Sequence, residues 1–227
     1  MLFRSSAAAA KKARQPGVGD LFRGPTLRLT LVSVMICALS LTGWWAFMFW
    51  QAQHVRSLPE VVSMSAGERD RLVAVTFALI IGISIVGNFV AGALAKRLGY
   101  KTALVIMFGG FFTTFLATFG PEHALPALTR FWLPAVGFWS GVFGLFTMLL
   151  PPLFPTLLRT TGAGFCYNIG RIAAAAGTIF AAQISRSGNF RQTLFYTGFL
   201  FLLAIPAVML LPKSTGDEAV AATEPVD

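Results

Sequence analysis

Acidic side chains are scarce in this sequence, and its long apolar stretches contain none. The 227 residues include nine Asp and Glu against eighteen Lys and Arg. Three stretches lack a carboxylate altogether: Leu21 to Pro59, Arg71 to Pro121 and His123 to Gly216. A proton relay inside a membrane usually needs a protonatable side chain there. These stretches alone therefore cannot supply a carboxylate relay.

Cysteine and histidine are equally rare. Cys37 and Cys166 both lie in apolar stretches, and two cysteines are too few for a disulfide framework or a zinc site. His54 and His123 fall at or beyond the ends of apolar runs. An enzyme needs a nucleophile, a base or metal ligands that converge, and no such set is visible. We therefore expect no enzyme, no bound metal and no cofactor.

Apolar residues make up most of the chain. Hydrophobic residues account for 56% of the sequence and charged residues for 12%, and the mean hydropathy is +0.71. Such a chain is too apolar for an ordinary soluble domain, so its expected surroundings are a lipid bilayer. The net charge of +9 invites a nucleic-acid partner. The cations instead lie in short connections without a recognition motif, so no nucleic-acid partner is expected.

Six apolar runs are long enough for membrane helices, which need about 20 residues each. They predict an all-α polytopic membrane protein with one six-helix domain over residues 29–212, after a basic leader (1–28) and before a tail (213–227). Ser65 and Glu68 form a capping box before the second run, and Gly99 separates the second run from the third. The predicted spans are Leu29 to Gln53, Leu72 to Ala95, Thr102 to Gly120, Phe131 to Leu153, Gly162 to Ser185 and Thr193 to Leu211.

The distribution of cations predicts the orientation of the spans. Eleven Lys and Arg fall on the side of the leader and tail, and six fall on the other side. By the positive-inside rule both termini are expected in the cytoplasm, with the chain in the inner (plasma) membrane. A targeting peptide is the alternative for the leader, but the apolar run that follows is longer than a signal-peptide core of about 7–15 residues.

The runs differ in character. The second and fifth are rich in Gly and Ala, which favours close helix packing. The third and sixth are rich in Phe and Leu, which favours lipid contact, and the first and fourth carry tryptophans that suit a cavity. This order repeats after three runs, as two inverted three-helix repeats would give.

Arg171 is the ionisable residue that lies clearly inside a predicted span, the fifth. A buried guanidinium costs about 3 kcal/mol or more, so it should face a partner or water. It could bind an anionic substrate, because its planar fork suits carboxylates. It could equally pair with a carboxylate outside this chain or extend to the interface. Its place two to three turns into the predicted span favours the structural interpretations.

Other polar and aromatic residues of the spans are weaker candidates for a substrate cavity. Asn168 shares a helix face with Arg171, and Asn88 lies in the second span; either could bind substrate or hold helices together. Trp residues could stack on a ligand, pack or anchor at the interface. The remaining candidates are Trp44, Trp45, Trp139 and, near the outer mouth, Gln51.

Two stretches resemble the major facilitator superfamily. The first, GALAKRLGYKTAL from Gly92, is similar to the family's loop signature G-x-L-a-D-R-x-G-R-K, with Gly92, Leu94, Arg97, Gly99 and Lys101 matching. Lys96 stands where the family has Asp, and Tyr100 where it has a basic residue, so the resemblance implies no salt bridge from the acidic position. What remains is a tight basic turn.

The second stretch, PPLFPTLLRTTGAG from Pro151, resembles the family's passage between its tenth and eleventh helices. Phe154, Pro155, Thr156, Arg159, Gly162 and Gly164 match, and Pro152 replaces the usual Glu. The leader's LFRGPTLRLTL also resembles the end of the family's central loop.

The resemblance maps the six runs onto helices seven to twelve of a twelve-helix transporter that works by alternating access. It implies a C-terminal half close to proton-linked symporters of metabolites, and a small organic acid as substrate. A sugar or drug efflux porter, and a non-transporting fragment or scaffold, remain alternatives. The expected partner is an N-terminal six-helix half, in the same gene or a separate chain, or a second copy. If six more spans are encoded directly upstream, Met1 is expected to be an internal start.

Overall fold

The computed structural model describes residues 17–184 and 189–212. These residues form helices and turns, with no strand among them. Short turns η1, η2 and η3 accompany the helices, and η2 is a π-helical turn. In chain order the elements are η1 (Val18–Phe22), α2 (Gly24–Ser57), α3 (Pro59–Val62), α4 (Ala66–Leu98), α5 (Tyr100–Phe119), α6 (Leu125–Ala127), η2 (Leu128–Trp132), α7 (Leu133–Trp139), α8 (Val142–Leu153), η3 (Thr156–Leu158), α9 (Arg159–Ile184), α10 (Phe190–Thr197) and α11 (Phe199–Met209).

Each of the six predicted spans falls on one or more helices. Within the described residues, five helical stretches are long and apolar enough to cross a membrane: Gly24–Ser57, Ala66–Leu98, Tyr100–Phe119, Leu125–Leu153 and Phe190–Met209. The fifth predicted span, Gly162 to Ser185, falls on α9, which has 26 residues, and its predicted end Ser185 lies outside the described residues. Asn168 and Arg171 lower the hydropathy of α9, and this helix is not among the five.

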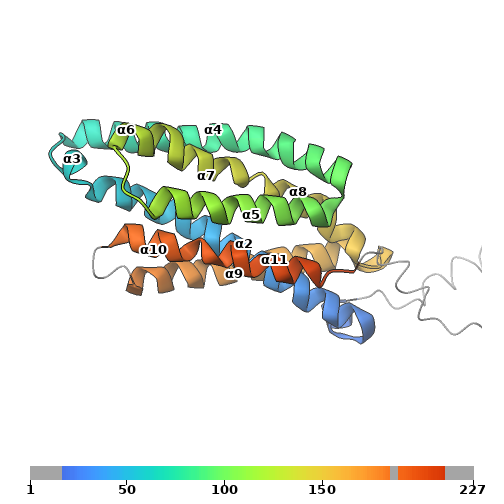
Figure 1. The fold of residues 1–227 in the computed structure, drawn as a ribbon. Coiled ribbons are helices and arrows are strands. Elements are labelled where there is room, and N and C mark those ends of the chain that lie inside the picture. Colours follow the sequence, from blue (N-terminus) through green and yellow to red (C-terminus); the bar gives the residue numbers. More distant parts are fainter. Residues whose placement is uncertain (1–16, 185–188, 213–227) are drawn as a thin grey trace, which may run out of the picture.

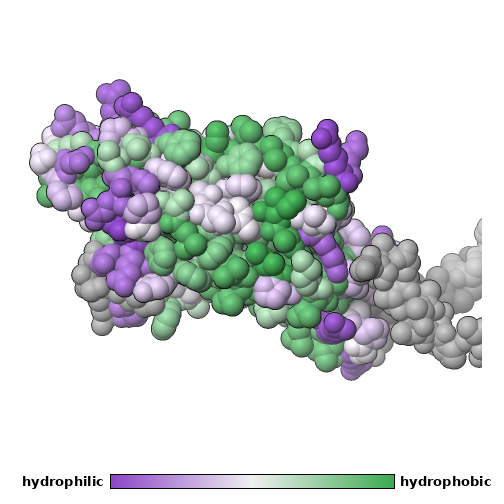
Figure 2. Space-filling view, in the orientation of Figure 1, coloured by the Kyte–Doolittle hydropathy of each residue, from purple (hydrophilic) through white to green (hydrophobic). Residues whose placement is uncertain are grey.

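The surface agrees with a membrane-spanning bundle. On the face shown in Figure 2, hydrophobic residues cover the middle of the molecule and hydrophilic residues gather toward its two ends. The helices run between these ends (Figure 1). A belt of this kind exposes apolar side chains where the hydrocarbon core of a bilayer would lie.

The helices divide into two groups of three that contact each other reciprocally (Figure 1). The first group is α2, α4 and α5; the second is the broken span α6–α8, then α9, then the broken span α10–α11. The first helix of each group packs on the second helix of the other, as α2 does on α9 and as α7 and α8 do on α4. The third helices, α5 and α11, pack on each other. This exchange is what two inverted three-helix repeats give.

Glycines allow the closest approaches between helices. A Cβ atom at Gly87 would lie 1.8 Å from the Phe138 carbonyl oxygen, and one at Gly141 would lie 2.1 Å from the Gly87 carbonyl carbon. On α9, a Cβ atom at Gly170 would lie 2.6 Å from the Cys37 Cβ atom of α2. The prediction that the second and fifth helices pack closely is confirmed at these positions. Open space surrounds Gly82, Gly92 and Gly164.

Aromatic rings fill the interior. Phe108, Phe111, Phe115 and Phe119 are buried, and their spacing places them on one face of α5. Phe201 of α11 stacks on Phe111 with 4.0 Å between ring centroids. The expectation that Phe-rich third and sixth helices face lipid is therefore wrong for these rings. Composition alone did not show that they share one inward face.

A capping box and a short turn precede two of the long helices, α4 and α2. Ser65 and Glu68 form the predicted capping box, with 3.0 Å from Ser65 N to Glu68 Oε2 and 3.4 Å from Glu68 N to Ser65 Oγ. At the start of the chain, η1 buries Leu21, whose carbonyl accepts a 2.9 Å hydrogen bond from Thr30 Oγ1. Helix α2 begins at Gly24, so the last residues of the predicted leader are helical. Residues 1–16 of the leader and the tail 213–227 lie outside the described residues.

Candidate substrate groove

A groove of about 600 Å³ lies between α2 and α9. This volume is within the range of small-molecule pockets, about 300–1,000 Å³. Its walls are mainly apolar, with one charged side chain, Arg171. We call this hollow the α2–α9 groove; it is lined by Trp45, Phe49 and Trp50 of α2 and by Arg171, Ala174, Ala175, Thr178 and Ile179 of α9.

Arg171 lies halfway along its helix. Helix α9 begins at Arg159 and has 26 residues, so Arg171 is the thirteenth. At 1.5 Å per residue it lies about 18 Å from the start of the helix, against a half-thickness of about 15 Å for the hydrocarbon core. Gly170 beside it packs on Cys37, in the middle part of α2. Measured along its helix, Arg171 therefore lies further from the start than the sequence predicted, because α9 begins at Arg159 and the predicted span begins at Gly162.

The sequence of α9 gives it two unlike faces. Gly170, Ala174 and Gly177 face α2, because a Cβ atom at Gly170 or Gly177 would meet Cys37 or Thr42 and Ala174 is buried. The other face exposes Asn168, Arg171 and Ile179. The small residues on one face let α9 pack closely against α2. Arg171 lies on the other face, so its guanidinium stays accessible.

Arg171 makes no hydrogen bond or ion pair with any described residue. Across the groove, α2 supplies aromatic rings, among them Trp45, which is 48% exposed. An accessible guanidinium and an exposed indole in one groove offer a charged fork and a flat apolar surface. This pair suits a planar molecule that carries a carboxylate.

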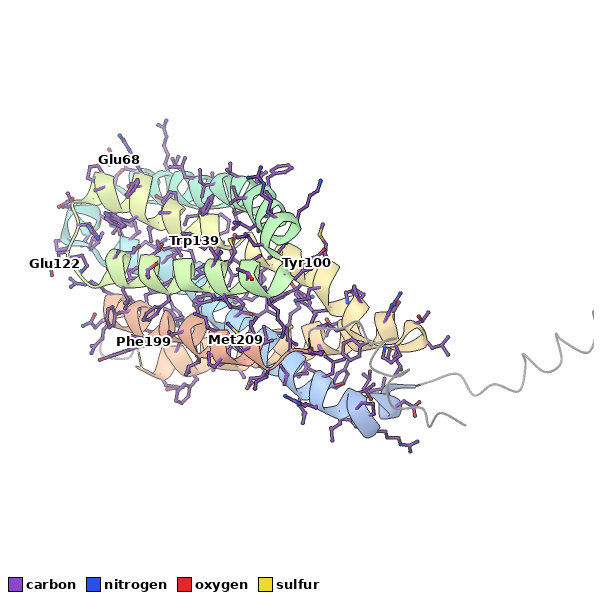
Figure 3. All side chains as sticks on the ribbon, turned by 45° about the vertical axis from the view of Figure 1, so that its right-hand side comes forward. Glu68, Tyr100, Glu122, Trp139, Phe199 and Met209 are labelled. Carbon is purple, nitrogen blue, oxygen red and sulfur yellow. The ribbon has the colours of Figure 1, made fainter. Side chains whose placement is uncertain are left out.

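Three of the predicted cavity residues lie outside the α2–α9 groove: Trp44 and Trp139 are half-buried, and Gln51 is buried. Trp44 packs among Phe47, Phe111 and Phe143, with ring centroids 5.6–6.1 Å apart. Trp139 points from α7 toward α5, where its Nε1 donates a 2.7 Å hydrogen bond to Thr114 Oγ1 (Figure 3). Neither lines the α2–α9 groove.

Gln51 is the third of these residues and lies in the interior. It is 1% exposed, and neither its Nε2 nor its Oε1 has a hydrogen-bond partner among the described residues. Its neighbour Trp50 points to a different surface, since Trp50 lines the groove and stacks on Phe190 at 5.6 Å. Consecutive helix residues point about 100° apart, which explains why one of the two faces the groove and the other the interior.

The two asparagines are exposed and bonded to their own helices. Asn88 Nδ2 donates to the Ser84 carbonyl at 2.9 Å, and Asn168 Nδ2 donates to the Gly164 carbonyl at 2.8 Å. Both Oδ1 atoms remain as acceptors. Asn168 lies one turn before Arg171, whereas Asn88 lies on α4 and outside the groove.

Sequence reasoning missed Phe49, Thr178 and Ile179 as groove residues. Their spacing from the predicted residues was the available signal: Phe49 follows Trp45 by four positions, and Thr178 follows Arg171 by seven. Residues at these spacings share a helix face. Which face of α2 meets which face of α9 depends on the packing of the whole bundle.

The first loop signature forms a tight turn between α4 and α5. Gly99 has φ of 83°, a conformation that favours glycine, so its predicted role in the bend is confirmed. Lys101 Nζ donates a hydrogen bond to the Leu211 carbonyl, which ties this turn to the end of α11. Lys96 and Arg97 are exposed, and a Cβ atom at Gly92 would meet open space.

The second signature closes the turn before α9. The buried Phe154 ring lies against Gly162, where a Cβ atom would come within 2.6 Å of it. Arg159 Nε donates to the Phe154 carbonyl at 3.4 Å. The motif therefore holds the start of α9, and with it the depth of Arg171, rather than contacting the groove.

Within residues 17–184 and 189–212, no group of three His, Cys, Asp or Glu side chains is placed to hold a metal ion. What the groove presents is a guanidinium, aromatic rings and one hydroxyl. Groups of these kinds are suited to binding and orienting a ligand.

Comparison with known proteins agrees with the fold. The profile of the family described as "Sugar (and other) transporter" matches residues 3–222. A protein named "Probable 4-methylmuconolactone transporter" from Cupriavidus pinatubonensis is 26% identical over 91% of this chain and 47% of its own length. A protein named "Cis,cis-muconate transport protein" from Acinetobacter baylyi is 26% identical over 57% of this chain and 32% of its own length. This chain thus spans about half the length of the relatives it matches.

The family match covers nearly the whole chain, and the six-helix arrangement and both loop motifs agree with it. The chain is a multi-pass membrane protein of the Sugar (and other) transporter family, within the major facilitator superfamily.

Proposed function

We propose that this chain forms the C-terminal half of a secondary transporter that moves a small organic acid across a membrane by alternating access. The observation that carries the proposal is Arg171, exposed in the α2–α9 groove halfway along its helix and without an acidic partner among the described residues. A transporter of this kind makes and breaks no covalent bond, which is why we propose no enzymatic activity.

The groove favours an unsaturated acid over a sugar. A sugar needs several hydrogen-bonding side chains, and the groove offers Thr178 and Arg171 among apolar and aromatic neighbours. A conjugated carboxylate would place its charge on Arg171 and its flat carbon chain against Trp45. The names of the two relatives, which refer to muconate and to a methylmuconolactone, support the same class of substrate.

An N-terminal six-helix half would supply the opposite wall. In α4, 17% of the apolar stretch is buried, against 44–56% in the other four stretches. Phe89 of α4 is 77% exposed, and Ile179 of α9, which lines the groove, is 66% exposed. We propose that the partner half covers the exposed faces of α4 and α9 and closes the groove into a cavity.

Uptake by a reconstituted transporter tests this function. The chain is joined in frame behind the N-terminal half of the Cupriavidus relative, placed in liposomes and supplied with labelled cis,cis-muconate or glucose. We expect uptake of muconate and not of glucose. Arg171→Ala should weaken apparent substrate affinity about 10- to 100-fold, because a hydrogen bond to a charged group contributes about 1.5–3 kcal/mol. Arg171→Lys should retain part of the affinity.

Arg71→Ala is the matched control, since Arg71 is exposed, lies outside the groove and belongs to neither loop signature. It removes the same charge and should leave muconate uptake unchanged. Equal uptake by the parent and Arg171→Ala at equal protein abundance, or a preference for glucose, would overturn the proposal.

We also propose that both ends of the chain lie in the cytoplasm. The excess of cations at the leader, the α4–α5 turn and the start of α9 supports this orientation. Green fluorescent protein fused after Asp227 should fluoresce, because it folds in the cytoplasm. An active alkaline phosphatase fusion at the same position would reverse the orientation.

A further inference from the structure

Two shallow hollows lie side by side at the end of the bundle where α2 begins and α11 ends. The first, of about 380 Å³, is lined by Arg28 and by apolar residues that include Leu29, Met209 and Leu210. The second, of about 350 Å³, is lined by Tyr100, Lys101 and Met148 among others. Both hollows include Leu153 and Pro212. We call the pair the α11 groove.

The charge at this end of the bundle is strongly one-sided. Among the described residues it carries one carboxylate, Asp20, which pairs with Arg23 at 3.5 Å. The cations at the same end are Arg23, Arg28, Lys96, Arg97, Lys101 and Arg159. We call it the basic end. Tyr100 marks it in Figure 3, opposite the end that holds Glu68 and Glu122.

The opposite end is close to balanced. Arg56 pairs with Asp70 at 2.9 Å, and Arg191 pairs with Glu122 at 2.8 Å. The apolar hollow at the basic end therefore lies where the described cations outnumber the described carboxylates six to one. A ligand that fits both features has an apolar body and an anionic head.

Arg28 is the cation best placed for such a head. It is exposed, it lines the first hollow, and it makes no ion pair or hydrogen bond with a described residue. Lys101 lines the second hollow and also binds the Leu211 carbonyl, which fixes the end of α11 between the two hollows. The walls are thus held in place while one guanidinium remains available at the rim.

We propose that the α11 groove binds a phospholipid with an anionic headgroup, with the phosphate at Arg28 and an acyl chain along Leu29, Met209 and Leu210. A basic pocket between helices at a membrane surface is suited to anionic lipid heads. A free phosphate would leave the apolar walls unused, and a zwitterionic lipid would gain less from the excess charge. The charge of the groove and its apolar lining together select this ligand.

Native mass spectrometry of the full chain, purified in mild detergent with added lipid, tests the inference. We expect palmitoyl-oleoyl phosphatidylglycerol to remain bound more than the phosphatidylcholine with the same chains. Arg28→Ala should lower phosphatidylglycerol binding about fivefold, as expected for one cation near the membrane surface. Met209→Trp, at a residue that is 58% exposed, should fill the hollow and lower binding without disturbing the core.

Arg97→Ala distinguishes a specific lipid site from general attraction by the positive charge at this end. Arg97 lies at the same end but lines neither hollow. It should leave lipid binding unchanged. An equal loss in Arg97→Ala and Arg28→Ala would overturn the site, as would equal retention of the two lipids. Displacement of the lipid by millimolar inorganic phosphate would indicate a phosphate site instead. Binding seen only after deletion of residues 213–227 would assign the groove to the tail and equally contradict the proposal.

Discussion

Two glycines on the same helix should respond to the same substitution with opposite signs. Gly82 and Gly87 both lie within α4, and an added Cβ atom at Gly82 meets open space. At Gly87 the added atom would lie 1.8 Å from the Phe138 carbonyl oxygen. That oxygen belongs to the backbone of α7, so it cannot move aside as a side-chain end would. Gly87→Ala must therefore push α4 and α7 apart.

The magnitudes follow from two competing effects. Replacing glycine by alanine inside a helix contributes about 0.5–1 kcal/mol of stability, because alanine loses less backbone entropy. Overpacking typically costs about 1–3 kcal/mol, and the contact at Gly87 is with backbone, which favours the upper part of that range. Gly82→Ala should thus stabilise the chain by up to about 1 kcal/mol, whereas Gly87→Ala should destabilise it by about 1–2 kcal/mol net.

Reversible unfolding in mixed micelles, with the fraction of sodium dodecyl sulfate as denaturant, measures both variants. The comparison is internal, since host helix, residue type and added volume are the same. Gly141→Ala, from the other side of the same contact, should resemble Gly87→Ala because its Cβ atom would lie 2.1 Å from the Gly87 carbonyl carbon. If Gly87→Ala were as stable as Gly82→Ala, the close approach of α4 and the α7–α8 break would be refuted.

Three further predictions use the same unfolding assay. Phe201→Ala should lower the free energy of unfolding by about 2 kcal/mol or more, because it removes a buried ring stacked on the core. Phe89→Ala, at an exposed position, should lower it by under about 0.5 kcal/mol. Equal losses in the two variants would contradict the aromatic interior. Arg191→Ala should lower the free energy of unfolding by about 2 kcal/mol, since Arg191 donates to two backbone carbonyls at the end of α5. Glu122→Gln removes only the exposed ion pair with Arg191 and should be near neutral. A larger loss in Glu122→Gln would refute the role of the two carbonyl contacts. Gly99→Ala should cost about 1–2 kcal/mol, because φ is 83° there; an unchanged midpoint would show that the turn tolerates another conformation.

The sequence was sufficient to predict the order of the helices, because each predicted span is a long apolar run between polar connections. Five of the six predicted spans coincide with helical stretches that are long and apolar enough to cross a membrane. The capping box at Ser65 and the bend at Gly99 were also predictable, since both depend on local chemistry. The direction in which each aromatic side chain points could not be predicted. Trp44 and Trp45 are adjacent in the sequence, yet one packs in the core and the other lines the groove. Only the packing of neighbouring helices separates them.

The depth of Arg171 connects the fold with the proposed function. A guanidinium halfway along a membrane helix costs about 3 kcal/mol on insertion scales. No described residue offsets that cost with an ion pair or a hydrogen bond. The candidates for the compensating group are water, the polar membrane interface, a carboxylate of a partner half and the carboxylate of a substrate. A partner carboxylate would make Arg171→Ala destabilise the assembled transporter, because it would leave a buried acid unpaired. A substrate carboxylate would instead leave stability unchanged and remove the protection against unfolding that muconate gives, so the two can be told apart by one melting experiment with and without ligand.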